Sequence, residues 1–339
     1  MNRDLGVPTT RGIWEKEVSR EGLTGSSIHE VELQSASNIQ YGQYLMLRVL
    51  WKDTAPKKID LKALELDHWT KLAKERLKDY DSWNRYCQNF GNEHIQEGTF
   101  SLVTYYQRQA FKTEIKEDIR PQVIFSPVAN RTRAKQREFM ESMRKLQLQT
   151  PTKKSRPRKD EQIVNTALLL FLNALTIHLP LQNAWTLHRK SFTATFTNAS
   201  FEARTDGYLR DKGSGKVRVI IEVKPAVRNK NKRSVRMQES AQMVGWTMSE
   251  TEGSIKPPGR YVHLSQDRNF IYLTFAKFDE NYVRYLKGDS NAPLSFLTMM
   301  EYGPWDTQQE DHMKHLAPIL LALALRADAD RETELTQQS

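Results

Sequence analysis

The chain has 339 residues, enough for one large domain or two ordinary ones, and its 38% hydrophobic and 27% charged content excludes wholesale disorder. The single cysteine, Cys87, excludes a disulfide framework and a cysteine zinc site within the chain, and it favours a reducing intracellular setting, nucleus or cytoplasm. The longest apolar run, 316–325, is far shorter than the roughly 20 residues of a membrane span, so we expect no membrane segment.

The formal net charge of +10 is concentrated in two short stretches, 153–159 and 228–236, which contain no acidic residue. Concentrated positive charge favours a polyanion such as nucleic acid, because neutralised phosphates release counterions. Two solvated loops, one of them a nuclear-import signal, would have the same composition. The candidate nucleic-acid contacts are Lys153, Lys154, Arg156, Arg158, Lys159, Arg228, Lys230, Lys232, Arg233 and Arg236.

The first part of the chain predicts mixed structure. We expect a strand-like region over 27–51, best at Tyr44–Trp51, and a helix over 60–88 from its apolar spacing. Further expected elements are strands at 100–108 and 122–125 and a charged amphipathic helix at 133–148. Residues 1–120 are therefore interpreted as an N-terminal extension, and 121–339 as the main domain with its core at 158–280.

The second part has a clearer order. Asp160 is a plausible N-cap for an apolar helix reaching about Ile177, and residues 234–250 predict a second helix. Strands are expected at 187–197, 201–209, 216–223, 260–264 and 270–275, and a last apolar helix at 309–326. The order of helix, three strands, helix and strand predicts an α/β (α+β) fold.

The segment Asp211–Lys216 (DKGSGK) has the glycines of a hairpin turn. With the turn centred on Ser214, Asp206 lies opposite Glu222, and such residues have Cα atoms about 4.5–5.5 Å apart. A bulge would shift this register by one residue. Strand alternation places Lys224 on the same face as Glu222, one pleat further on.

Two adjacent carboxylates repel each other unless a positive charge lies between them, and Mg²⁺ or Mn²⁺ can supply that charge. A nearby lysine could then activate a metal-bound water or stabilise charge on a phosphate. Asp206, Glu222 and Lys224 would equally suit a salt-bridged polar face of an exposed hairpin.

Both flanking helices carry polar residues in suggestive positions. Glu161 is in line with the apolar stripe of its helix and could point inward, or it could be a first-turn acid that complements the helix dipole. Gln238 and Gln242 are four residues apart and share a helix face with Trp246, although glutamines on a helix are commonly surface residues.

An acid-bearing helix, an Asp on the second strand, Glu-x-Lys on the third and a Gln-bearing helix together resemble the PD-(D/E)xK nuclease superfamily. Gln242-Met-Val-Gly-Trp246 is similar to the QxxxY motif of its exonuclease and RecB-like branch, with Trp in place of Tyr. The text IEVKP followed by QESAQMVGW also resembles fungal proteins that carry such domains. The resemblance covers roughly residues 120–305, and it departs from the motif at Thr205, where the motif has proline.

The resemblance implies a restriction-endonuclease-like core and a Mg²⁺- or Mn²⁺-dependent nuclease that acts on DNA or RNA. Asp206 and Glu222 would be metal ligands, with Glu161 as an additional metal or water ligand. Lys224 would be the catalytic lysine, and Gln242 or Gln238 would contact phosphate or position that lysine. The alternatives are a catalytically inactive nuclease-fold module that binds nucleic acid, and a protein-interaction protein.

Overall fold

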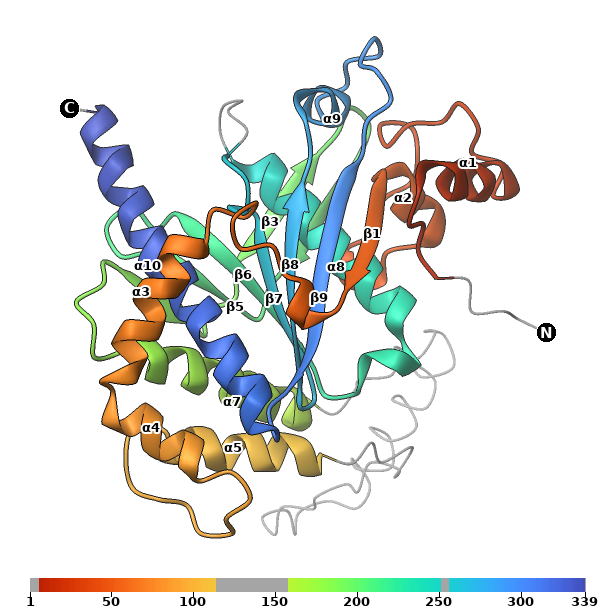
Figure 1. Cartoon of the computed structure of the whole chain (residues 1–339). Helices are drawn as coiled ribbons and strands as arrows, with labels where there is room; N and C mark the ends of the chain where they lie inside the picture. Colours follow the sequence, from red (N-terminus) through yellow and green to blue (C-terminus); the bar gives the residue numbers. More distant parts are fainter. Residues whose placement is uncertain (1–5, 114–157, 251–255, 339) are drawn as a thin grey trace, which may run out of the picture.

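The computed structural model describes residues 6–113, 158–250 and 256–338, which form a mixed α+β fold around a seven-stranded sheet (Figure 1). The strand order is β1-β9-β8-β7-β6-β5-β2. The strands are β1 (Val49–Thr54), β2 (Asn183–Thr186), β5 (Gly207–Asp211), β6 (Val217–Lys224), β7 (Val262–Asp267), β8 (Phe270–Lys277) and β9 (Leu297–Asp306). Two neighbouring pairs, β1 with β9 and β6 with β7, are parallel, and the other pairs are antiparallel.

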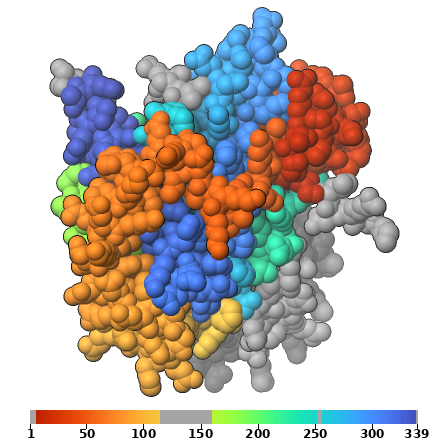
Figure 2. Space-filling view, in the orientation of Figure 1, coloured from red at the N-terminus to blue at the C-terminus, as the bar shows by residue number. Residues whose placement is uncertain are grey.

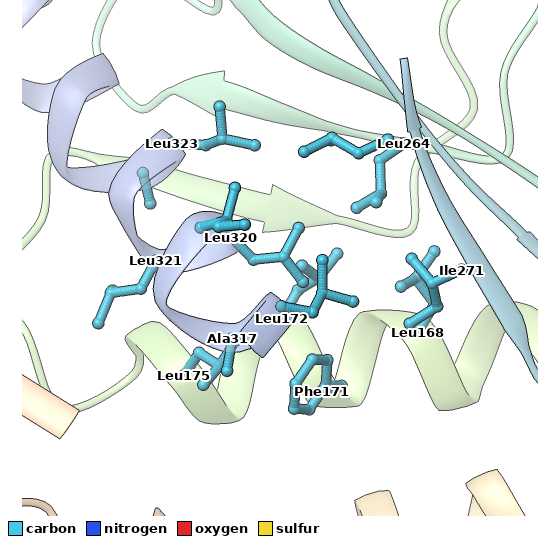
Figure 3. Close-up of a cluster of buried hydrophobic side chains, with 14 of the residues drawn as sticks. Leu168, Phe171, Leu172, Leu175, Leu264, Ile271, Ala317, Leu320, Leu321 and Leu323 are labelled. Carbon is cyan, nitrogen blue, oxygen red and sulfur yellow. The ribbon is translucent and has the colours of Figure 1, made fainter. Parts of the chain in front are cut away.

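Two long helices, α7 (Arg158–Thr176) and α10 (Glu310–Gln338), cover one face of the sheet. Their leucines pack on the apolar side chains of β7 and β8, including Leu264 and Ile271 (Figure 3). The helices α3 (Asp67–Lys78), α4 (Asp81–Gln88) and α5 (Ser101–Lys112) pack outside α7 and α10. In the space-filling view, the orange N-terminal segments lie across the blue α10 (Figure 2).

The other face is covered by α8 (Lys232–Ser249), and a separate two-stranded sheet of β3 (Ser191–Thr195) and β4 (Ser200–Arg204) packs against this helix. A second apolar cluster joins these elements to α1 (Arg11–Arg20), α2 (Tyr41–Met46) and α9 (Glu280–Leu286). Helix α8 connects β6 to the parallel strand β7. The single-turn helices η1 (Ala36–Asn38), η2 (Pro56–Lys58) and η3 (Arg228–Lys230) complete the described elements.

The structure differs from several predictions for the N-terminal part of the chain. Residues 100–108, predicted as a strand, belong to helix α5, because Val103, Gln107 and Ala110 are buried at helical spacing. The predicted strand at Tyr44–Trp51 is instead the end of α2 followed by β1, and the chain changes direction at Arg48, whose φ is 51°. The predicted helix over 60–88 is two helices, α3 and α4.

Several C-terminal elements differ from the prediction in extent. The strand expected at 201–209 is divided into β4 and β5, which belong to different sheets. Helix α7 begins at Arg158, before the expected cap at Asp160, and α10 extends well past residue 326. Strands β2 and β9 and helix α9 were not predicted; β9 contains Gly303-Pro304, a typical breaker, which the irregular pairing between β8 and β9 accommodates.

The elements predicted at 122–125 and 133–148, and the boundary near residue 120, lie outside the described residues. The segment before them is integrated into the fold, because β1 is an edge strand of the large sheet and α3, α4 and α5 add side chains to the core beside α7 and α10. No helix in the described part of the chain is long and apolar enough to span a membrane.

Burial predicts how leucine substitutions will rank. Leu168 is fully buried in the core on α7, so Leu168→Ala should lower the free energy of unfolding by about 2–5 kcal/mol through lost apolar contact and a residual cavity. Leu187 is 64% exposed, so Leu187→Ala should change it by less than about 0.5 kcal/mol. Urea denaturation of both variants tests this ranking, and equal effects would contradict the packing described here.

Candidate functional site

Asp206 lies where the chain leaves the small sheet and enters the large one, immediately before β5. The pairs Gly207 with Ile221 and Tyr208 with Ile220 place Asp206 opposite Glu222 by continuation, as the hairpin predicted. A register shift occurs between Leu209 and Arg210, on the turn side of these pairs. Asp206 is therefore beside Glu222, although it is not a strand residue.

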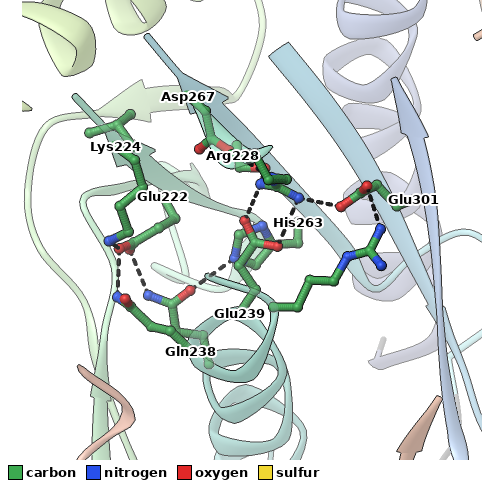
Figure 4. Close-up of polar contacts among 12 residues, drawn as sticks. Glu222, Lys224, Arg228, Gln238, Glu239, His263, Asp267 and Glu301 are labelled. Carbon is green, nitrogen blue, oxygen red and sulfur yellow. Dashed lines mark hydrogen bonds and ion pairs between the residues drawn. The ribbon is translucent and has the colours of Figure 1, made fainter. Parts of the chain in front are cut away.

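Glu222 is buried between β6 and α8, and its carboxylate is surrounded by donors (Figure 4). Gln238 Nε2 donates to Oε1 and Gln242 Nε2 donates to Oε2, each at 2.6 Å. The Lys224 ammonium forms an ion pair with Oε1. The predicted glutamines thus contact the predicted acid directly, because α8 packs its polar face onto the end of β6.

The Asp206 carboxylate is also buried, and both of its oxygens have partners. The backbone N–H of Val223 donates to Oδ2 at 3.2 Å, and Arg189 Nη2 lies 3.0 Å from Oδ1. The same Arg189 nitrogen is 4.0 Å from Glu161 Oε1. Arg189, whose side chain is 65% exposed, therefore lies between the two acids and joins Glu161 to the cluster.

His263 on β7 supports Gln242 from behind. Its Nε2 lies 2.9 Å from Gln242 Oε1, while the Gln242 amide nitrogen donates to Glu222 and to the Arg204 carbonyl. Because the amide oxygen faces the ring, His263 must be the donor through Nε2. Burial lowers the pKa of His263 to about 3, so the ring is neutral.

Sequence reasoning missed Arg189 and His263. Arg189 falls within the strand predicted at 187–197, but β3 begins only at Ser191, and nothing in the strand pattern marked this arginine as a contact of Asp206. His263 reaches the site because β7 pairs with β6 in parallel, with Ile220 opposite His263 and Glu222 opposite Ser265. The alternation of residues in β7 indicates which face of the sheet His263 lies on. The sequence does not show which strand pairs with β7.

The electrostatics of the cluster are dominated by burial. Burial, together with the neighbouring Asp206, raises the pKa of Glu222 to about 7 against the opposing attraction of Lys224. Burial acts to lower the pKa of Lys224, but Glu222, Asp206 and Glu161 outweigh it and the pKa is raised. Lys224 is therefore cationic at neutral pH, while Glu222 exchanges its proton near neutrality.

The residues present suit a hard divalent ion only as an open site. Within the described residues, no group of three or more His, Cys, Asp or Glu side chains is arranged to hold a metal ion. Asp206 and Glu161 converge on the exposed Arg189, which supplies the positive charge between them. Asp206 and Glu222 are the residues that would hold Mg²⁺, which is usually bound by one or two carboxylates and keeps several waters.

The basic stretch at 228–236 is not the exposed patch that its composition predicted. The Arg228 guanidinium is fully buried and forms ion pairs with Asp267, Glu239 and Glu301 (Figure 4). Arg236 is also buried, between Glu301 and Asp53. The burial of both arginines contradicts their predicted role as phosphate contacts, because each guanidinium already forms ion pairs with carboxylates of the same chain.

Other predicted basic contacts are placed differently. Lys232 forms an ion pair with Asp53 at 2.7 Å, and the Arg233 guanidinium lies 3.6 Å from the centre of the Tyr41 ring. Lys230 is in η3, and Arg158 and Lys159 are in the first turn of α7. Lys153, Lys154 and Arg156 lie outside the described residues.

Comparisons with known proteins assign no family to this chain. No protein-family model matches the sequence, and no significant match is found among curated proteins. The chemistry of the Asp206–Glu222–Lys224 cluster and its surroundings therefore carries the functional argument.

The buried arginine network yields a stability prediction. Arg228→Met should lower the free energy of unfolding by roughly 3–5 kcal/mol, because it leaves Asp267, Glu239 and Glu301 without their shared cation. The matched control is Arg210→Met, at an exposed position, which should change it by less than about 0.5 kcal/mol. Chemical denaturation of both variants measures the difference, and a stable Arg228→Met protein would show that the network is dispensable.

Glu222 yields a pH prediction for the metal-free protein. Its folded pKa of about 7 exceeds the ordinary 4.5, so its stabilising contribution is complete below about pH 4.5 and is lost as the pH rises through 7. Glu222→Gln removes this titration. The loss of unfolding free energy between pH 5 and pH 8 should therefore be smaller in this variant than in wild type by roughly 2–3 kcal/mol. Urea denaturation at both pH values measures it, with the exposed Glu202→Gln as control. A decline as steep in Glu222→Gln as in wild type would contradict the shift.

Proposed function

We propose that this protein is a metal-dependent nuclease that hydrolyses phosphodiester bonds in DNA or RNA. The observation that carries the proposal is the buried pair of acids, Asp206 and Glu222, with the Lys224 ammonium on Glu222. Burying two like charges side by side is costly for a structural role alone, and it is typical of sites that bind a cation. A nucleic-acid partner is part of this proposal.

The surrounding topology supports a restriction-endonuclease-like core. Helix α7 brings Glu161 to the site, the residue before β5 is Asp206, β6 brings Glu222, and α8 brings the two glutamines. Helix α8 is also the crossover between the parallel strands β6 and β7. This order matches the resemblance to the PD-(D/E)xK superfamily.

Each residue has a distinct proposed role. Asp206 and Glu222 would hold Mg²⁺ or Mn²⁺, with Glu161 at the entrance, and a bound ion would supply a nucleophilic hydroxide and neutralise phosphate charge. Lys224 presents a fixed positive charge beside Glu222, where it can stabilise charge that develops on the phosphate. Gln238 and Gln242 orient the Glu222 carboxylate, and His263 fixes the orientation of Gln242.

A catalytically inactive module that binds nucleic acid is the second candidate. The observation that favours it is that both Glu222 oxygens already have donors and that Arg189 occupies the space between Asp206 and Glu161. Such a protein would retain the acidic cluster as a self-neutralised polar core. Turnover distinguishes the two candidates.

Lys224 provides the sharpest test of catalysis. Lys224→Ala should lower the single-turnover rate of cleavage in Mg²⁺ or Mn²⁺ by about two to four orders of magnitude, the usual contribution of a positioned charged group. Substrate affinity should change little, because one lost phosphate contact is a small part of the total. Asp206→Asn should abolish cleavage through loss of the ion. The measurement uses protein in excess over labelled plasmid, linear DNA and RNA.

The matched control is Lys277→Ala, an exposed lysine at the end of β8, which should cleave at the wild-type rate. Cleavage that survives Lys224→Ala undiminished would place the active site elsewhere. Wild-type protein that binds nucleic acid but cleaves none of these substrates would favour the inactive module.

A further inference from the structure

A groove opens beside the candidate site, lined by residues of β3, the β5–β6 turn, the C-terminal end of α8 and α9. It encloses about 580 Å³, within the size range of sites that bind small ligands. Its charged lining consists of four lysines and one acid, Lys190, Lys216, Lys256, Lys287 and Glu250. We refer to these residues and the space between them as the lysine groove.

The side chains at the inner end of the lysine groove are held in place by contacts with one another. The Lys256 ammonium pairs with Glu250 and lies 4.6 Å from the ring centres of both Trp246 and Tyr261. Glu250 is held in turn by Trp246 Nε1 at 2.9 Å and the Tyr261 hydroxyl at 3.1 Å. Burial lowers the pKa of Lys256 to about 8, which leaves it mostly protonated at neutral pH. A cation is therefore fixed at this end.

The remaining lysines leave the groove with a positive surplus. Lys216 is neutralised by Glu334 at 2.7 Å, whereas Lys190 and Lys287 are exposed and have no ion-pair partner in the described residues. The serine and threonine residues of the lining are Ser191, Thr193, Ser214, Thr247 and Ser249. Ammonium groups and hydroxyls together are the donors that contact a phosphate backbone.

One end of the lysine groove, at Lys190, lies next to the candidate site. Lys190 directly follows Arg189, whose guanidinium contacts Asp206, and its carbonyl accepts the backbone N–H of Thr205 at 3.0 Å. Residues 190–193 then extend along β3 as one wall of the groove. A chain of phosphates bound at Asp206 would reach the groove at Lys190.

We infer that the lysine groove binds a short length of single-stranded nucleic acid that continues from the candidate site. The inference that the ligand is a nucleic acid rests on the proposed function. The lining of the groove indicates that this nucleic acid is single-stranded. The wall of the groove includes the aromatic side chains of Phe192, Trp246, Tyr261 and Phe278. A positive channel with aromatic side chains in its wall is the common way to hold a single strand.

Charge reversal at the two unpaired lysines tests the inference in the full chain. Lys190→Glu/Lys287→Glu should weaken binding of a labelled oligothymidylate of about 12 residues at least tenfold at about 0.1 M salt, and the log–log salt slope should fall by about 1.4. The measurement is fluorescence anisotropy in EDTA, so that cleavage does not interfere. A blunt duplex of the same length should lose less affinity than the single strand.

The matched control is Lys57→Glu/Lys58→Glu, which makes the same charge change on exposed η2 outside the groove and should alter affinity by less than about threefold. Equal losses in the two double variants, an equal loss for duplex, or no single-strand binding by wild type would overturn the inference. Cleavage in Mg²⁺ is scored separately. If binding depends on the groove lysines but no substrate is cleaved, the nuclease proposal is wrong and the inference about the groove is supported. If substrates are cleaved but binding does not depend on the groove lysines, the nuclease proposal is supported and the inference about the groove is wrong.

Discussion

The pairing of buried charges beneath α8 is the constraint on which this structure depends. A helix on a sheet usually buries an apolar stripe, but α8 faces β6, β7 and β9 with Gln238, Glu239 and Gln242 in the described contacts. Isolated, each of these groups would cost several kcal/mol to bury, and a charged group more. The Arg228 guanidinium and the donors around Glu222 offset that cost, and they fix where α8 lies on the sheet.

This arrangement also explains how much could be predicted. The hairpin register was predicted because the turn is local, so that Asp206 meets Glu222 across a short loop. The glutamines followed from helical spacing on the next element. The burial of Arg228 was not predictable by these means, because Asp267 and Glu301 are 39 and 73 residues away in sequence. A basic run appears the same in a sequence whether its partners are phosphates or distant carboxylates.

The missed elements have related causes. Residues 100–108 of helix α5 were predicted as a strand because Val103, Tyr105 and Tyr106 favour strands by propensity, whereas the packing of α5 on α7 determines the helix. The chain passes from β4 in the small sheet to β5 in the large sheet at Thr205 and Asp206, where alternation over 201–209 gave no sign of a change of sheet. Arg189 and His263 reach the site through long-range packing, so the chemical core was predictable from the sequence and its supporting residues were not.

The edge strand β1 has a consequence for how the chain is made. It is parallel to β9, with Val49 beside Leu297, so its backbone partner emerges from the ribosome long after β1 itself. Until then the apolar side chains of Leu50 and Trp51 have no sheet to join, and an unpaired strand of this kind is prone to aggregation. The large sheet therefore cannot be completed until the residues of β9 have been synthesised, so its edge depends on a contact between segments far apart in the sequence.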